Sequence, residues 1–351
     1  MTLPHSLPIA MTPGDPCGIG PEILAKAWLQ ASDLTHGCFV AGDVGVMRRA
    51  AALVASPVRL PVCEITTAQE AWQVPPRCMP VLQVVDVAPA LPWGQIDARA
   101  GRLAAECVLW ATRAALRGEL AALVTAPLHK EALHAAGAPW DTYPGHTELL
   151  QAEAARHAGV ALEAMPVRMM LANDELRTVL VSIHMSLRQA LEAVTHEQVL
   201  QTLRITHASL SRLLGHAPRM GVAGVNPHAG EGGLFGREEI DVLQPALAQA
   251  RSEGMDVQGP FAPDTVFMRA RKKADAPGEF DVVIAMYHDQ GLIPVKYLGV
   301  EQGVNVTLGL PLIRTSPDHG TAMDLAGQGR ADASSLIQAL RMARQLAGWP
   351  A

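Results

Sequence analysis

The sequence predicts an α/β fold, with largely parallel sheets divided between two lobes. Apolar runs of strand length alternate with helix-length amphipathic stretches, a pattern typical of α/β proteins. At 351 residues the chain is longer than a usual single domain, which favours two lobes. With 49% hydrophobic and 18% charged residues, it has enough apolar material for buried cores.

Seven short apolar runs are predicted to form the buried strands. In chain order they are Ile9–Thr12, Phe39–Ala41, Ala121–Thr125, Val167–Leu171, Thr178–Ile183, Met220–Val225 and Asp281–Met286. Between the second and third strands, apolar residues recur at the spacing of one helical face, which predicts a helix over Arg102–Arg117. Gly118 is expected to end this helix, because glycine tolerates a left-handed backbone. Another helix is predicted to begin near Lys130.

Breaks near Pro144 and Gly299 are predicted to separate the lobes. Lobe one then comprises residues 1–144 and 300–351, and lobe two residues 145–299. The proline-rich stretch Ala55–Pro80 is expected to be irregular or an insertion in the first lobe. Residues 271–279 begin with three basic side chains and are expected to form an exposed loop.

Composition narrows the class of function. A formal charge of −6 disfavours a nucleic-acid-binding protein, and three Tyr and five Phe are too few for a base-stacking surface. The five cysteines are scattered and never spaced as Cys-x-x-Cys, which predicts reduced thiols in a cytoplasmic protein. No apolar run is long enough to span a membrane, and no export signal is visible.

Three histidines follow three of the predicted strands: His184, His228 and His288. In open α/β sheets, ligands bind beyond the carboxyl ends of the strands, so the three imidazoles are placed where they could converge. Imidazole is a common ligand of Zn, Co, Ni and Fe, and three such ligands leave positions open for a substrate. A single histidine after a strand is also explained as a loop residue or a buried imidazole, so both interpretations stay open on spacing alone.

Other polar residues indicate an anionic substrate. His146 and Thr147 lie at the start of a predicted helix, where free N–H groups favour phosphate. Lys296 and Arg314 are further candidate phosphate or carboxylate partners, although each could equally be a solvated surface cation. Neither a Walker A loop nor a Gly-x-Gly-x-x-Gly fingerprint is present. These residues indicate a metal-dependent enzyme acting on a small anion, without naming a nucleotide cofactor.

Seven segments, in order across nearly the whole chain, resemble the 4-hydroxythreonine-4-phosphate dehydrogenase family of pyridoxal phosphate biosynthesis. They are Thr12–Glu22, Thr125–Lys130, Gly145–Glu148, Asn226–Gly232, Ala285–Gly291, Gly303–Pro311 and Arg314–Ala322. The resemblance implies a fold similar to isocitrate and isopropylmalate dehydrogenases, with two α/β/α lobes and the active site between them. It also implies a homodimer. Lobe one would be the cofactor side and lobe two the metal and dimer side.

The resemblance assigns roles to particular residues. It implies that His184, His228 and His288 bind one divalent ion (Zn, Co or Mg), in a site shared between subunits. It implies that substrate contacts come from His146, Thr147, Lys296, Asn305 and Arg314. NAD or NADP is expected at Asp318, His319, Gly320 and Asp324. Lys296 is the first candidate for the residue that takes the proton, and Asp264 the second.

The implied reaction is oxidation of 4-phosphohydroxy-L-threonine to a β-keto acid, which loses CO₂ to give 3-amino-2-oxopropyl phosphate. Relatives acting on 4-phospho-D-threonate or 4-phospho-D-erythronate share the phosphate and remain alternatives. The intact phosphate residues disfavour a cis-dihydrodiol substrate. A non-catalytic metal or phosphate binder on the same fold is the alternative of another class, and it predicts a lost ligand or cofactor loop.

Overall fold

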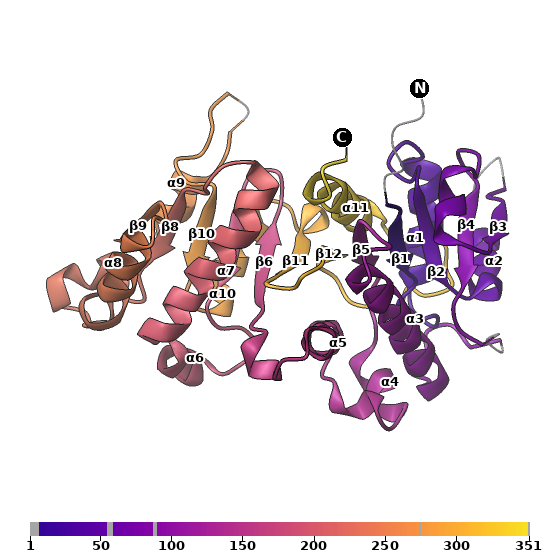
Figure 1. The fold of residues 1–351 in the computed structure, drawn as a ribbon, viewed down its shortest axis with the longest axis horizontal. Helices are drawn as coiled ribbons and strands as arrows, with labels where there is room; N and C mark the ends of the chain where they lie inside the picture. Colours follow the sequence, from indigo (N-terminus) through magenta and orange to yellow (C-terminus); the bar gives the residue numbers. More distant parts are fainter. Residues whose placement is uncertain (1–6, 55–58, 87–89, 274, 350–351) are drawn as a thin grey trace. The chain divides into compact units, whose positions relative to one another are not determined.

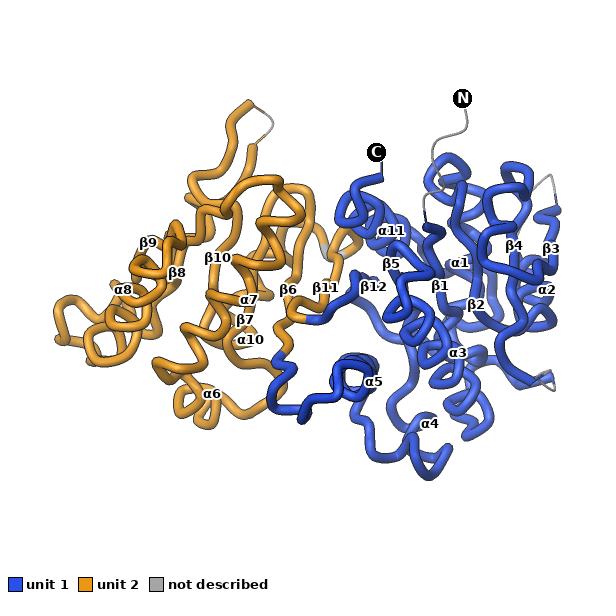
Figure 2. The backbone as a smooth tube through the Cα atoms, viewed as in Figure 1, with its two compact units in different colours: residues 1–166, 310–351 blue, residues 167–309 orange. Residues whose placement is uncertain are grey.

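The structure is a computed structural model that describes residues 7–54, 59–86, 90–273 and 275–349 (Figure 1). The chain divides into two compact units (Figure 2). Unit 1 consists of residues 1–166 and 310–351, and unit 2 of residues 167–309. Within the described residues, none of the helices combines the length and the apolar character that crossing a membrane requires.

Unit 1 is built on six strands in the spatial order β3-β4-β2-β1-β5-β12, and every neighbouring pair is parallel. The strands are β1 (Ile9–Thr12), β2 (Cys38–Gly42), β3 (Val62–Ile65), β4 (Met79–Gln83), β5 (Ala122–Thr125) and β12 (Arg314–Pro317). The helices are α1 (Gly20–Gln30), α2 (Val44–Leu53), α3 (Ala98–Leu116), α4 (Lys130–Ala135), α5 (His146–Ala158) and α11 (Ser334–Leu346). All residues of β1, β2 and β5 are buried, so both faces of this sheet are covered, as parallel sheets require. Single 3₁₀ turns occur at Ala68–Trp72, Trp140–Thr142 and Leu162–Ala164.

Unit 2 also has six strands, in the order β11-β6-β7-β10-β8-β9. They are β6 (Arg168–Ala172), β7 (Arg177–Leu180), β8 (Met220–Ala223), β9 (Val257–Phe261), β10 (Val282–Ala285) and β11 (Val304–Leu308). Only β6 is antiparallel to its neighbours, β7 and β11. The helices are α6 (Leu187–Ala193), α7 (His196–Leu214), α8 (Gln244–Ser252), α9 (Val266–Ala270) and α10 (His288–Tyr297). Short helical turns are η4 (Pro227–Gly233), the π-helical η5 (Glu239–Leu243) and η6 (Val300–Gln302).

Residues on both faces of the unit 2 sheet are buried. Leu180 and Ala285 belong to one core cluster with Leu292 of α10. Successive strand residues point to opposite faces, so Val179 and Ile284 face the other way, and both are fully buried. The sheet is therefore an inner layer, and ligands can reach it only at its edges.

The predicted α/β class with mostly parallel sheets is confirmed. The helix expected over Arg102–Arg117 spans Ala98–Leu116, and Gly118 has the left-handed φ of 74° expected of its role. The stretch Ala55–Pro80, expected to be irregular or an insertion in the first lobe, is not irregular throughout, because it contains β3. That strand lies at the sheet edge and is half-exposed, so its sequence lacks the continuous apolar run of a central strand. Residues 55–58 and 274, which belong to the predicted irregular stretch and loop, lie outside the described residues.

The units divide at Pro166 and Gly309, later than the breaks expected near Pro144 and Gly299. Helix α5 consequently belongs to unit 1. An ion pair of 3.0 Å between Arg113 of α3 and the buried Glu153 of α5 joins the two helices. The residues next to Arg113 and Glu153 in the sequence give no indication of this long-range contact.

Candidate active site

The three histidines of the predicted metal site follow three adjacent parallel strands of unit 2. His184 comes after β7, His288 after β10 at the start of α10, and His228 after β8, in the spatial order β7-β10-β8. The carboxyl ends of parallel strands lie at one edge of a sheet. All three side chains are therefore attached to the same edge of unit 2.

Two of the three imidazoles lie close together. The ring centroids of His184 and His288 are 5.7 Å apart. The rings lie beside a cavity of about 570 Å³ that is also lined by Met185, Leu187 and Tyr287. His228 is not part of this pair, and its ring lies 6.2 Å from that of Phe235. Over the described parts of the chain, no three His, Cys, Asp or Glu side chains are placed around a common metal position.

The donor chemistry at this edge suits a transition metal. Nδ1 of His288 lies 2.7 Å from Oδ1 of Asp289, which leaves Nε2 of the same ring for another partner. A carboxylate bound to the second ring nitrogen is the usual support of a metal-binding histidine, because it fixes the tautomer and the ring orientation. His184 and His288 are therefore compatible with a shared divalent ion, and one chain supplies two of the three expected ligands side by side.

Lys296 and Asn305 lie toward the other edge of unit 2. Lys296 follows His288 by eight residues of helix α10, which corresponds to a rise of about 12 Å. Asn305 lies near the start of β11, paired with Leu171 near the end of the reversed strand β6. A single chain thus places these two residues away from the histidine edge. Asp264, by contrast, is exposed just beyond the carboxyl end of β9, the neighbour of β8.

Three of the predicted anion-binding residues, His146, Thr147 and Arg314, lie in unit 1 around the start of α5. His146 is the first residue of this 13-residue helix and Thr147 the second, as the sequence predicts. Arg314, the first residue of β12, is buried, and its Nε and terminal nitrogen lie 3.1 and 2.7 Å from Oγ1 of Thr125. Thr125 ends the neighbouring strand β5, so this hydrogen bond directs the guanidinium along the sheet.

The electrostatics of this cluster favour an anion. Burial lowers the pKa of Arg314 to about 10, although the nearby carboxylate of Glu148 raises it. The guanidinium therefore stays charged at neutral pH. Burial, with the charge of Arg314 nearby, lowers the pKa of His146 well below its ordinary value, so its ring is neutral. Nε2 of His146 is buried and has no protein partner. The cluster thus presents a cation, a neutral imidazole and the N-terminus of a helix.

The predicted cofactor residues follow β12 in unit 1. Asp318, His319 and Gly320 come directly after this strand, and the loop continues through the exposed Asp324. The backbone carbonyl of Thr321 in this loop accepts a hydrogen bond of 3.0 Å from the N–H of Ile19. The glycine-rich loop after β1 and the loop after β12 therefore pack together at the carboxyl edge of the unit 1 sheet. A Cβ on Gly320 would meet no atom within 4 Å, so a ligand has room beside this backbone.

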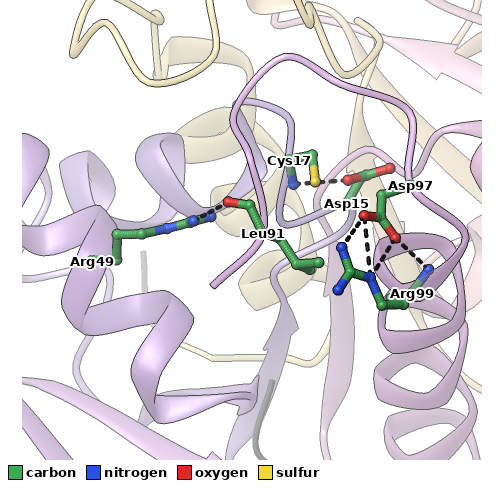
Figure 3. Close-up of polar contacts among 6 residues, drawn as sticks. All are labelled: Asp15, Cys17, Arg49, Leu91, Asp97 and Arg99. Atoms are coloured by element: carbon green, nitrogen blue, oxygen red, sulfur yellow. Dashed lines mark hydrogen bonds and ion pairs between the residues drawn. The ribbon is translucent and has the colours of Figure 1, made fainter. Parts of the chain in front are cut away.

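A buried carboxyl group lies in the loop after β1 (Figure 3). Asp15 is fully buried, and its Oδ1 accepts a hydrogen bond of 2.8 Å from the N–H of Cys17. Its Oδ2 has no protein partner. Burial raises the pKa of Asp15 to about 6. Figure 3 also shows Asp97, which binds Arg99 at the start of α3, and Arg49, which donates to the carbonyl of Leu91.

Sequence reasoning missed three of these residues, namely Thr125, Asp289 and Asp15. Each lies inside or beside a segment that the resemblance singled out. No local pattern distinguishes a threonine that binds a distant arginine from any other strand residue. Their roles become visible only in the hydrogen bonds of the folded chain.

Known proteins resemble the chain over almost its whole length. The sequence model of a family described as "Pyridoxal phosphate biosynthetic protein PdxA" matches residues 35–343. A 4-hydroxythreonine-4-phosphate dehydrogenase of Beijerinckia indica subsp. indica is 49% identical over 339 residues, which cover 97% of this chain and 95% of that protein. A D-threonate 4-phosphate dehydrogenase of Salmonella typhimurium is 43% identical over 339 residues, covering 97% and 98%. The crystal structure of 4-hydroxythreonine-4-phosphate dehydrogenase from Klebsiella pneumoniae matches with a TM-score of 0.84 and 41% identity, covering 97% of this chain and 100% of that one.

Proposed function

We propose that the substrate of this chain, which belongs to the family of the pyridoxal phosphate biosynthetic protein PdxA, is 4-phosphohydroxy-L-threonine. Like its relatives, the chain is an oxidoreductase acting on a CH–OH group. The reaction is a metal-dependent, NAD-linked oxidation to a β-keto acid, which loses CO₂ to give 3-amino-2-oxopropyl phosphate. The observation that carries the proposal is the anion cluster of unit 1. It joins the buried Arg314 and the neutral His146 at the N-terminus of α5.

This cluster would hold the substrate's phosphate. Arg314 would donate to the phosphate oxygens, held in place by its hydrogen bonds to Thr125. The unpaired N–H groups of the first turn of α5, including that of Thr147, would donate as well. His146 is neutral, so its partner-free Nε2 can donate or accept a hydrogen bond without adding charge.

The metal site would be built from His184, His228 and His288, and the bound ion (Zn, Co or Mg) would supply a Lewis acid that lowers the pKa of the substrate hydroxyl. Lys296 and Asn305 of the same chain lie toward the opposite edge of unit 2. This separation supports a homodimer in which a second copy of the chain completes the site. Asp264 and Lys296 remain the two candidates for taking the hydroxyl proton, and Asp264 is the one at the histidine edge of its own chain.

The loop after β12 would hold NAD or NADP, which would supply the hydride acceptor. Asp318 and Asp324 could accept hydrogen bonds from ribose hydroxyls, and the open backbone at Gly320 lets the cofactor come close. The loop after β1 supports this segment through Ile19 and Thr321. The five free cysteines are consistent with a cytoplasmic enzyme.

The alternative substrates are 4-phospho-D-threonate and 4-phospho-D-erythronate. The 43% identical D-threonate 4-phosphate dehydrogenase of Salmonella typhimurium favours keeping this alternative. All three substrates carry the phosphate that the unit 1 cluster would bind. They differ around the amino group.

The test is to strip the protein with a chelator and follow NADH formation from 4-phosphohydroxy-L-threonine and from 4-phospho-D-threonate. Each substrate is assayed with and without added Zn, Co or Mg. We expect metal-dependent turnover that favours the amino acid. Faster turnover of the threonate would keep the chemistry and change the substrate. No NADH from either substrate would refute the proposed reaction.

A further inference from the structure

The loop that carries His228 has an unusual backbone. Five consecutive residues, His228 to Gly232, have positive φ angles between 43° and 79°, and three of them are not glycine. L-residues rarely adopt this left-handed conformation, because Cβ then approaches the following carbonyl oxygen. Such a run persists only where surrounding contacts impose it.

Glu239 hydrogen-bonds to residues that come just before this left-handed turn. Its side chain is only 1% exposed. Oε1 accepts hydrogen bonds from the backbone N–H groups of Val225 (2.7 Å) and Asn226 (2.8 Å). Oε2 accepts a third from Nδ2 of Asn226, at 3.0 Å. One carboxylate thus holds two of the four residues that lead from β8 into the left-handed turn.

The same carboxylate is packed against the turn itself. A Cβ on Gly230 would lie 2.7 Å from Oε2 of Glu239, and a Cβ on Gly224 would lie 3.0 Å from Oε1. A side chain at either position would crowd the carboxylate, together with Ala229 at Gly224 and with Gly236 at Gly230. The loop and Glu239 are therefore fitted to each other on both sides of His228.

A second buried side chain links this strand end to that of His288. Nε2 of Gln290 donates to the carbonyl of Gly224 at 2.8 Å, and Oε1 of Gln290 accepts from the N–H of Met286 at 2.7 Å. Gln290 thus ties the end of β8 to the end of β10. Glu239 completes this frame, since it holds the N–H groups that follow Gly224.

We propose that Glu239 is a positioning residue that presents His228 to a divalent metal ion by holding the left-handed turn. It does not contact the metal. This inference rests on the proposed three-histidine site and extends it to a residue outside the ligand set. Supporting residues of this kind change metal affinity by about 10- to 100-fold when replaced.

The decisive variant is Glu239→Gln, which is the same size. It can still accept from the two backbone N–H groups, but its new NH₂ group faces Nδ2 of Asn226, so two donors oppose each other. Glu238→Gln is the matched control. Glu238 is the exposed neighbour, and its carboxylate accepts from the same Nδ2 at 2.6 Å without touching the backbone of Val225 or Asn226.

The full-length protein is stripped of metal and titrated with Co²⁺, whose visible absorption reports nitrogen ligands. We expect Glu239→Gln to weaken Co²⁺ binding at least tenfold and Glu238→Gln to change it less than twofold. Thermal unfolding of the metal-free proteins checks that each variant is folded. If Glu239→Gln is unfolded, Asn226→Ala, which removes the opposed Nδ2, is introduced with it and the titration repeated.

A double variant tests whether Glu239 acts through His228. His228→Asn should weaken Co²⁺ binding, and adding Glu239→Gln to it should cause little further loss. A lower melting temperature with unchanged Co²⁺ affinity would show a purely structural role and overturn the inference. So would additive losses in the double variant.

His184→Asn separates this inference from the proposed function. If His184→Asn weakens Co²⁺ binding but Glu239→Gln does not, the metal site stands and the positioning role is refuted. If the parent protein binds no Co²⁺, the proposed site fails and the inference fails with it.

Discussion

Replacing Asp15 by asparagine should stabilise the protein at pH 8 and do so progressively less as the pH falls. Asp15 is fully buried, and burial, the main cause, raises its pKa from 3.8 to about 6. Above pH 6 the carboxylate is ionised in the folded protein, where its burial costs free energy. In the unfolded chain the same carboxylate is in water and has no such cost. As the pH falls below 6, the folded state binds a proton first, and the cost disappears below the unfolded pKa of 3.8.

The size of the effect follows from the two pKa values. Their difference of about two, at about 1.4 kcal/mol per pH unit, gives a cost of roughly 3 kcal/mol at pH 8. About 2 kcal/mol of this cost is lost between pH 8 and pH 4.5 by the same linkage. Asparagine carries no charge, and its side-chain oxygen can still accept the hydrogen bond from the N–H of Cys17. Its unpaired NH₂ group subtracts about 1–2 kcal/mol at every pH, so the pH dependence is the diagnostic quantity.

The assay is urea unfolding of the parent and Asp15→Asn at pH 8, 6 and 4.5. We expect the free energy of unfolding of the variant, relative to the parent, to fall by about 2 kcal/mol across this range. Asp97→Asn is the control of opposite sign, because hydrogen bonding to Arg99 lowers the pKa of Asp97. Its loss of stability should be the same at all three pH values, because a carboxyl with a lowered pKa loses its contribution only below the ordinary pKa of 3.8. A difference between Asp15→Asn and the parent that is constant with pH would refute the reasoning.

Three further predictions follow from other contacts. Gly291→Ala should lower the free energy of unfolding by about 1–3 kcal/mol in urea, because the new Cβ would lie 2.4 Å from Cδ2 of Leu180. Arg314→Lys should raise KM for the phosphorylated substrate by about 10- to 100-fold in the NADH assay. The reason is that lysine lacks the planar guanidinium that can bind phosphate and Thr125 together. The control is Arg168→Lys, at a partly buried arginine of unit 2, which should leave KM unchanged. Chelation should abolish NADH formation, and added Zn or Co should restore it, whereas activity that survives a chelator would exclude the metal.

Part of the fold could be predicted because many of the buried strands and amphipathic helices have a pattern in their own residues. A strand covered on both faces needs a continuous apolar run, and Ala122–Thr125 and Val282–Ala285 show one. The start of α5 at His146 and the end of α3 before Gly118 follow from backbone preferences of single residues. The edge strand β3 was missed for the same reason, since a half-exposed strand leaves no such run.

The sequence alone also placed His184, His228 and His288 after strands, and it identified the family, which the comparisons confirm. Tertiary structure decided which of these strand ends are neighbours. Strand pairing joins residues far apart in the chain, and no local periodicity encodes its order. That order, β7-β10-β8, places His184 beside His288 and puts both on the edge that carries His228.

Long-range contacts decided the rest of the candidate site. Arg314 and Thr125 are 189 residues apart, yet their hydrogen bond shapes the anion cluster. Asn305 lies near the start of β11, which runs parallel to β7, so the strand arrangement places it away from the histidine edge. Glu239 looks like an ordinary helix carboxylate until the fold buries it against the backbone of Asn226. The sequence determined which residues are candidates for the chemistry, because side-chain type is local. The fold decided which of them meet, because proximity depends on how the whole chain closes on itself.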